Sequence, residues 1–256
     1  MKIIFSKYHG AGNDFILIDN RNNTYHLSEK EIETLCHRRF GIGADGLMFI
    51  EEDSETDFKM RYYNSDGKEG SMCGNGGRCI VAFANEIGIQ KEHYRFNAID
   101  GLHEAFLKGT EVNLKMTNVN SIQNIDNHWF LDTGSPHAVE IVTNLNEINV
   151  SEKGEKLRYD TRFGDSGTNV NFIEIDKNIL KIRTYERGVE AETYACGTGA
   201  VASAIIANQL QPELNKFILN ALGGQLEVSF ENTNQQYSNI WLKGPAIKVF
   251  SGNIKL

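Results

Sequence analysis

The apolar positions of this chain fall in short runs that polar loops separate. The runs Phe15–Ile18, Leu47–Ile50 and Lys59–Tyr63 have the length and the apolar or alternating pattern of β-strands. Further strands are expected at Glu104–Met116, Gln225–Phe230 and Asn239–Leu242. The pattern therefore predicts a chain that is rich in strands.

Two segments without helix breakers interrupt this pattern. Cys79–Ala84 and Ala200–Ala207 are apolar or small on nearly every helical face. A helix of this kind must be buried all round. Strands on every side of each helix are the simplest arrangement that achieves such burial.

A third helix is predicted nearer the N-terminus, at Ser28–Phe40. Ser28 and Glu31 have the spacing of a capping box at its start. Cys36 lies near the apolar stripe of this helix together with Phe40, so we expect Cys36 in the core.

An internal repeat is indicated by four pairs of segments. Each second member lies 122 or 123 positions after the first. The pairs are Gly12–Asp14 with Ser135–His137, Phe49–Glu51 with Phe172–Glu174, Lys59–Asn64 with Lys181–Glu186, and Cys73–Gly77 with Cys196–Ala200. We interpret residues 1–117 and 118–246 as two copies of one unit, with a C-terminal strand or tail at 247–256.

Composition and charge exclude several classes of protein. The 256 residues are 40% hydrophobic, which is enough for a core, and the net charge of −8 disfavours binding to nucleic acid or to anionic membranes. No run approaches the roughly 18 apolar residues of a membrane span, and the first residues lack the pattern of a signal peptide. The four cysteines form no CxxC pair, so we expect reduced thiols in the cytoplasm and no metal.

Cys73 and Cys196 each begin a C-G-x-G sequence directly before an apolar helical segment. The first-turn N–H groups of a helix lack intrahelical partners, and the helix dipole adds partial positive charge there. Both effects favour a thiolate and lower the thiol pKa below its ordinary value of about 8.5. The glycines allow close approach of a ligand, and the same N–H groups can hold a substrate carboxylate.

The duplication of this arrangement points to a specific chemistry. A lone cysteine before a helix is more often a packing residue, as we expect for Cys79, but two equivalent ones are hard to explain by packing. If the two copies face each other, Cys73 and Cys196 meet at one cleft. One thiolate then removes a proton from one face of a carbon, and the other thiol delivers a proton to the opposite face. This is the two-base mechanism of a racemase or epimerase that needs no cofactor.

A competing interpretation rests on Gly197–Ala202, which matches the dinucleotide-binding pattern G-x-G-x-x-A. That pattern requires a buried strand before it and an acidic residue at the end of a strand about 20 residues later. Glu190–Tyr194 is instead a charged stretch, and Gln211–Leu214 is predicted to be a loop. The context therefore disfavours a dinucleotide site.

The motifs together resemble those of the diaminopimelate epimerase family. They are Gly10–Phe15, Gly41–Gly46, Tyr63–Gly67, Met72–Arg78, Tyr185–Gly188 and Ala195–Gly199. The two C-G motifs are shared with a wider superfamily that includes proline racemases, whereas Gly-Asn-Asp-Phe and Glu-Arg-Gly narrow the resemblance to this family.

The resemblance implies an α/β (α+β) fold of two pseudo-symmetric domains, each a β-barrel-like sheet wrapped around a central buried helix. It implies interconversion of LL- and meso-2,6-diaminopimelate in lysine and peptidoglycan precursor synthesis, without cofactor or metal. The expected partner is a small amino-acid substrate, and the enzyme is expected to be cytoplasmic and a possible homodimer.

The resemblance also assigns roles to individual residues. Cys73 and Cys196 match the acid/base pair, and His137 and Glu186 match residues that tune the protonation of the thiols. The residues implied to bind substrate are Asn13, Asn64, Ser135, Asn169, Glu186 and Arg187, with Gly74, Asn75, Gly197 and Thr198 at the helix-start amides around the α-carboxylate.

Three positions depart from the family pattern. Ser135 stands where many members have asparagine, Gly46 stands where some have glutamine, and Val189–Glu192 is expected to bulge. Two alternatives to the diaminopimelate assignment stay open. One is an amino-acid racemase of the proline-racemase type, and the other is a non-catalytic amino-acid-binding protein with the same fold.

Overall fold

The computed structural model describes residues 2–256, and the chain divides into two compact units. The first unit comprises the chain up to Leu114 together with Pro245–Leu256, and the second comprises Lys115–Gly244. Over residues 2–256, no helix has both the length and the apolar character that crossing a membrane requires.

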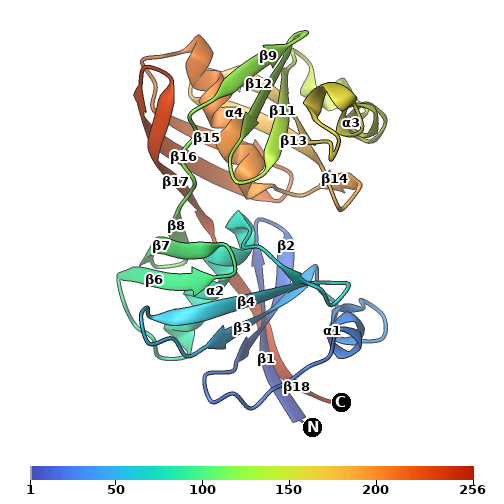
Figure 1. Cartoon of the computed structure of the whole chain (residues 1–256), viewed down its shortest axis with the longest axis vertical. Helices are drawn as coiled ribbons and strands as arrows, with labels where there is room; N and C mark the ends of the chain where they lie inside the picture. Colours follow the sequence, from blue (N-terminus) through green and yellow to red (C-terminus); the bar gives the residue numbers. More distant parts are fainter. Residues whose placement is uncertain (1) are drawn as a thin grey trace. The chain divides into compact units, whose positions relative to one another are not determined.

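The first unit is a set of strands around one long helix (Figure 1). Its elements are β1 (Lys2–Gly10), β2 (Asn13–Asp19), α1 (Glu29–Cys36), β3 (Gly46–Glu51), β4 (Phe58–Asn64), β5 (Glu69–Gly70), α2 (Gly74–Glu86), β6 (His93–Ala98), β7 (Gly101–Lys108), β8 (Glu111–Lys115) and β18 (Ile247–Lys255). β2 is antiparallel to β1 and parallel to β3, and β4 is antiparallel to β3 and β5 and parallel to β6. The antiparallel pairs β6–β7, β7–β8 and β1–β18 complete the unit.

The second unit repeats this order of pairing. Its elements are β9 (Ile122–Ile125), β10 (His128–Asp132), β11 (Pro136–Ile141), η1 (Leu145–Glu147), α3 (Val150–Arg158), η2 (Thr161–Phe163), β12 (Asn169–Asp176), β13 (Ile179–Glu186), β14 (Ala191–Thr193), α4 (Gly197–Leu210), β15 (Lys216–Ala221), β16 (Gly224–Thr233) and β17 (Gln236–Pro245). β11 is antiparallel to β10 and parallel to β12, and β13 is antiparallel to β12 and β14 and parallel to β15. The predicted fold class, two repeated domains of mixed α and β structure, is therefore confirmed.

The central helices are buried as their composition requires. α2 packs against β1, β2, β3 and β7, and α4 packs against β10 to β13, β15 and β16. Every residue of α4 from Gly199 to Asn208 is buried, whereas α2 buries one cation, Arg78, among its small and apolar residues.

Two predicted elements differ in the structure. α1 begins with the predicted capping box but ends at Cys36, because the His37 imidazole accepts the N–H groups of Arg39 and Phe40 and turns the chain. Cys36 is buried as predicted, but Phe40 is 82% exposed.

The strand predicted at Glu104–Met116 is a hairpin of β7 and β8, which turns at Gly109 with a φ of 63°. Residues 247–255 form β18 beside β1 and thus belong to the first unit.

Candidate active site

Cys73 is the N-cap residue of α2. Its Sγ accepts a hydrogen bond from the N–H of Gly76 at 3.2 Å, and the residue is half-buried. A Cβ atom on Gly76 would lie 3.0 Å from Met48 and 3.2 Å from the Cys73 Sγ. Glycine at this position therefore lets the thiol sit against the first-turn amides, whose partial positive charge favours a thiolate.

Cys196 has the same place in the second unit, as the N-cap residue of α4. Its Sγ accepts from the N–H of Gly199 at 3.4 Å and lies 3.4 Å from the Thr198 hydroxyl. A Cβ atom on Gly199 would lie 2.3 Å from Oδ1 of Asn171, so only glycine fits here. Cys196 is 9% exposed, which places its thiol in a drier environment than that of Cys73.

His137 is linked to Cys196 through Thr198. The fully buried imidazole lies with Nε2 2.9 Å from the Thr198 Oγ1 and with Nδ1 2.9 Å from Nδ2 of Asn171. The amide of Asn171 is oriented by its other contacts, because its Oδ1 accepts from Thr184 and its Nδ2 donates to the carbonyl oxygen of Ala138.

This network fixes the tautomer of His137. Since Asn171 donates to Nδ1, the imidazole proton lies on Nε2 and is donated to the Thr198 hydroxyl. The single hydrogen of that hydroxyl is then directed to the Cys196 Sγ, 3.4 Å away. The arrangement stabilises a negatively charged sulfur without requiring a charged histidine.

The pKa of His137 agrees with a neutral imidazole. Burial, with a smaller contribution from the positive charge of Arg187, lowers its pKa to about 3. In the unfolded chain the pKa is about 6.5, so below that pH the unfolded state binds a proton that the native state does not. This group therefore makes stability fall as the pH drops from about 6.5 towards 3.

We predict a measurable acid destabilisation from this one residue. Between pH 7 and pH 5, the wild type should lose about 2 kcal/mol more free energy of unfolding than His137→Gln does. Urea denaturation at the two pH values measures the difference. His93→Gln, at an exposed position of β6, serves as the control and should follow the wild type. Equal losses in the wild type and His137→Gln would contradict a neutral buried imidazole.

Ser135, Asn169 and Arg187 form a second cluster in the same unit. The Asn169 amide donates to the Ser135 hydroxyl at 2.8 Å and to the Pro136 carbonyl oxygen, and its Oδ1 accepts the backbone N–H of Arg187 at 2.9 Å. The Arg187 guanidinium lies 3.4 Å from the Ser166 hydroxyl. A half-buried guanidinium of this kind can bind a carboxylate with two hydrogen bonds.

Glu186 ends β13 beside the turn that leads to β14. Its Oε1 accepts from the Thr193 hydroxyl at 2.5 Å. The turn places Glu190 at a φ of 57°, and the Glu190 carboxylate accepts the N–H of Gly188 and pairs with Arg158. The extra length expected at Val189–Glu192 is thus taken up by a tight turn and a short antiparallel strand.

The first unit holds Asn13 and Asn75 in a separate polar chain. The Asn13 amide donates to Asp45 at 2.7 Å and accepts from Asn75, and Oδ1 of Asn75 accepts from Arg78 at 2.9 Å. Burial opposes ionisation of neighbouring Asp14, but hydrogen bonds and charges from Arg38 and Lys7 hold its pKa well below the ordinary value.

Arg78 is fully buried below the Cys73 loop. It donates to the carbonyl oxygens of Gly74 and Pro245 at 3.0 and 3.5 Å. Burial lowers the pKa of this guanidinium, and electrostatic interaction with Cys79 and Cys73 partly offsets this effect. Arg78 belongs to the Met72–Arg78 motif, but no role was predicted for it. The signal that could have indicated one is a lone cation at the start of an apolar helical segment.

The side chain of Asn64 and the space beside Gly46 are the last two predicted features of the site. Asn64 is exposed at the end of β4, where its main chain closes a turn with Gly67 and Lys68. A Cβ atom on Gly46 would lie 2.5 Å from the Tyr62 ring, so that ring fills the space a longer side chain would need.

Asn171 and Thr184 orient His137, but the sequence pattern did not predict a role for either residue. The available signal was that Asn171 lies on the same face of its strand as Asn169, two positions earlier.

Solved structures of other proteins share this fold. The fold resembles that of a phenazine biosynthesis protein of the PhzF family from Bacillus anthracis, with a TM-score of 0.80, 14% identity and full coverage of both chains. It also resembles a hydroxyproline epimerase from Agrobacterium vitis, with a TM-score of 0.72, 13% identity, and coverage of 100% of this chain and 93% of that one. At these identities the likeness shows the fold alone.

Curated relatives are much closer in sequence. A diaminopimelate epimerase from Flavobacterium psychrophilum is 50% identical over 97% of this chain and 98% of its own length. One from Chlorobaculum tepidum is 44% identical over 96% and 99%. The protein is an epimerase and so an enzyme of the isomerase class. The family model described as diaminopimelate epimerase matches residues 5–122 and 129–249, and the chain belongs to that family.

Proposed function

We propose that the enzyme interconverts LL- and meso-2,6-diaminopimelate. The observation that carries the proposal is the 50% identity to a relative named diaminopimelate epimerase, which extends over 97% of the chain. The cysteine N-caps of α2 and α4 add the chemical groups that such a reaction needs.

Cys73 and Cys196 supply the base and the acid in this proposal. A thiolate of one takes the proton from the α-carbon, and the electron pair of the broken C–H bond stays on that carbon. The S–H bond of the other thiol then breaks, and its proton forms a new C–H bond on the opposite face. No net oxidation occurs, and reversal exchanges the two roles.

The surroundings of each thiol support such proton transfers. The N–H groups of Gly76 and Gly199 point at the two sulfurs, and the Thr198 hydroxyl, fixed by His137, adds a donor to Cys196. We assign the helix-start amides at Gly74, Asn75, Gly197 and Thr198 to the reacting α-carboxylate, because first-turn amides bind anions. The same contact stabilises the negative charge that spreads from the carbanion onto the adjacent carboxylate.

The distal end of the substrate is itself an amino acid and needs both acceptors and donors. We assign its carboxylate to Arg187 and its remaining polar groups to Ser135, Asn169, Asn13, Asn64 and Glu186. The hydrogen bonds that link Asn169 to Ser135 and Arg187 support this grouping within the second unit. The positive charge of Arg187 also disfavours protonation of His137, so the imidazole stays neutral.

We further propose that the enzyme acts in the cytoplasm, in lysine and peptidoglycan precursor synthesis, and as a homodimer. Its net charge of −8 supports a small-molecule substrate over a nucleic acid partner.

A substrate panel tests the proposal. The enzyme is incubated with LL-diaminopimelate, L-proline or trans-4-hydroxy-L-proline, and the stereoisomers are separated by chiral chromatography. We expect meso-diaminopimelate from the first and no change in the other two. The hydroxyproline bound in the Agrobacterium structure makes that amino acid the second candidate substrate. Reaction of proline or hydroxyproline alone would overturn the assignment, and no reaction with any of the three would favour the non-catalytic binding protein.

A further inference from the structure

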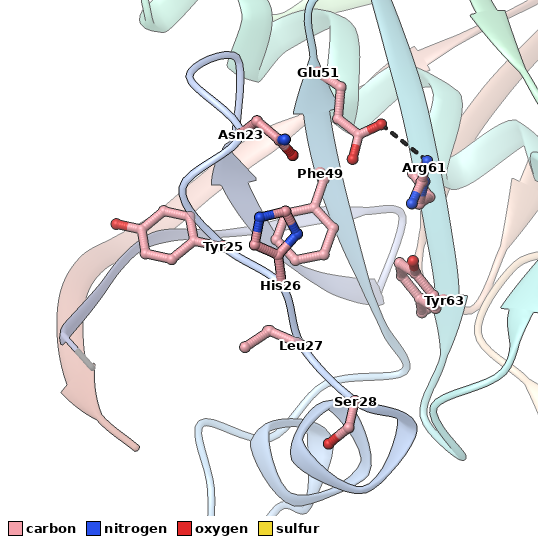
Figure 2. Close-up of a pocket in the computed structure, with 9 residues that line it drawn as sticks. All are labelled: Asn23, Tyr25, His26, Leu27, Ser28, Phe49, Glu51, Arg61 and Tyr63. Carbon is pink, nitrogen blue, oxygen red and sulfur yellow. Dashed lines mark ion pairs between the residues drawn. The ribbon is translucent and has the colours of Figure 1, made fainter.

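A cavity of about 360 Å³ lies in the first unit, beside the segment 23–28 (Figure 2). Its wall on the sheet is formed by Phe49 and Glu51 of β3 and by Arg61 and Tyr63 of β4. None of these four side chains has a role in the proposed reaction.

The internal repeat gives each wall residue an equivalent in the second unit. Phe49 is opposite Arg61 in the β3–β4 ladder, and Phe172 is opposite Arg183 in the β12–β13 ladder. By the same register Glu51 corresponds to Glu174, Tyr63 to Tyr185, and Glu69 to Glu192. The two units therefore build the same wall from the same residue types.

In the second unit a peptide segment covers this wall. The Leu145 N–H donates to the Glu174 carboxylate at 3.0 Å, and Arg183 donates to the carbonyl oxygens of Leu145 and Ile148 at 3.3 and 2.9 Å. The Leu145 side chain is buried in a cluster with Phe172 and Tyr185. The wall thus binds one N–H donor through its glutamate, carbonyl acceptors through its arginine, and a leucine side chain through its aromatic residues.

In the first unit Tyr25 and Leu27 of the segment 23–28 pack against the cluster that contains Phe49, and the cavity lies between this segment and the wall residues equivalent to those of the second unit. Arg183 binds Glu192 with two hydrogen bonds of 2.6 and 2.8 Å, but the Nε of Arg61 is 3.9 Å from Glu69. This Nε is buried and makes no hydrogen bond. Arg61 lies 3.3 Å from Glu51, and Figure 2 shows both side chains and Tyr63 at the edge of the cavity.

We propose that this cavity binds a free α-amino acid with an aliphatic side chain. Its ammonium group binds Glu51 in the way that the Leu145 N–H binds Glu174. Its carboxylate binds Arg61 in place of the two carbonyl oxygens, and hydrogen bonds between two ionised groups are stronger than those that Arg183 donates to neutral carbonyl oxygens. Its side chain packs against Tyr63 and the segment 23–28, at the edge of the nearly buried Phe49.

L-Leucine is the probe that tests this site. Its binding to the full-length protein is measured by saturation-transfer NMR and by calorimetry, for the wild type and for Arg61→Gln and Glu51→Gln. Each substitution should weaken binding about tenfold or more, because each removes a charged partner of one end of the ligand. The matched control, Arg95→Gln at an exposed position of β6, should bind as the wild type does. Circular dichroism checks that every variant is folded.

Three results would overturn the proposal. The first is the absence of saturable leucine binding to the wild type, and the second is unchanged binding in folded Arg61→Gln, which would place leucine elsewhere. The third is equal binding of N-acetyl-L-leucine amide, which lacks both charges and would show that the wall takes a peptide segment. Since the test measures leucine binding, its outcome is independent of whether diaminopimelate is the substrate.

Discussion

Alanine in place of either Cys73 or Cys196 is expected to lower kcat for diaminopimelate interconversion by about 10²–10⁴-fold. This is the usual contribution of a positioned general acid or base. Both thiols are N-cap residues whose sulfur accepts a first-turn N–H group, so each is held in place before the substrate arrives. The two losses should be similar, because every turnover in the proposed mechanism uses both groups. Rates in both directions, from LL and from meso substrate, measure them.

Cys36→Ala and Cys79→Ala are the matched controls. Both thiols are buried, burial raises the pKa of Cys36 to about 12, and burial likewise raises the pKa of Cys79. Neither can act as a base near neutral pH, so both variants should keep most of the wild-type kcat. A folded Cys73→Ala or Cys196→Ala variant with more than a tenth of the wild-type rate would contradict the two-thiol mechanism.

Arg78→Ala is expected to lower the free energy of unfolding by about 3–5 kcal/mol. The substitution leaves a cavity where a fully buried side chain was. It also takes a charged donor from the carbonyl oxygens of Gly74 and Pro245, which hold the start of α2 and the last segment of the first unit. Urea denaturation at pH 7 measures the loss.

The exposed Arg95 provides the control for Arg78. Arg95→Ala should change stability by no more than about 0.5 kcal/mol, as surface substitutions usually do. A loss below 1 kcal/mol in Arg78→Ala would show that the buried guanidinium is not needed to hold the Cys73 loop in place.

The sequence pattern was most informative where local chemistry decides the structure. The repeat, the buried helices and the cysteines before them all follow from residue type and spacing, and the structure places Cys73 and Cys196 at equivalent N-caps. The capping box at Ser28 was predictable for the same reason, because its partners are three residues apart. The roles assigned to the site residues, and the copy boundaries at 117 and 246, stay predictions.

What the pattern did not reveal depends on contacts between distant segments. The end of α1 is decided by the imidazole of His37, which competes with the helix for backbone N–H groups. The orientation of His137 depends on Asn171 and Thr184, which lie 34 and 13 positions from their partners in that network. The ligand proposed for the cavity beside Arg61 depends on the contacts of Arg183 in the other unit, because the two units have the same wall and different coverings.

Isotope incorporation during the first turnovers tests the two-base mechanism most directly. The wild-type enzyme is supplied with LL-diaminopimelate in D2O, and substrate and product are analysed by mass spectrometry and NMR at early times. We predict that meso product carries one solvent deuterium at the inverted α-carbon while recovered LL substrate stays unlabelled, because the donor thiol is not the group that removed the proton. Meso product that keeps the hydrogen of the substrate would show that one base moves the proton across, and would contradict the account.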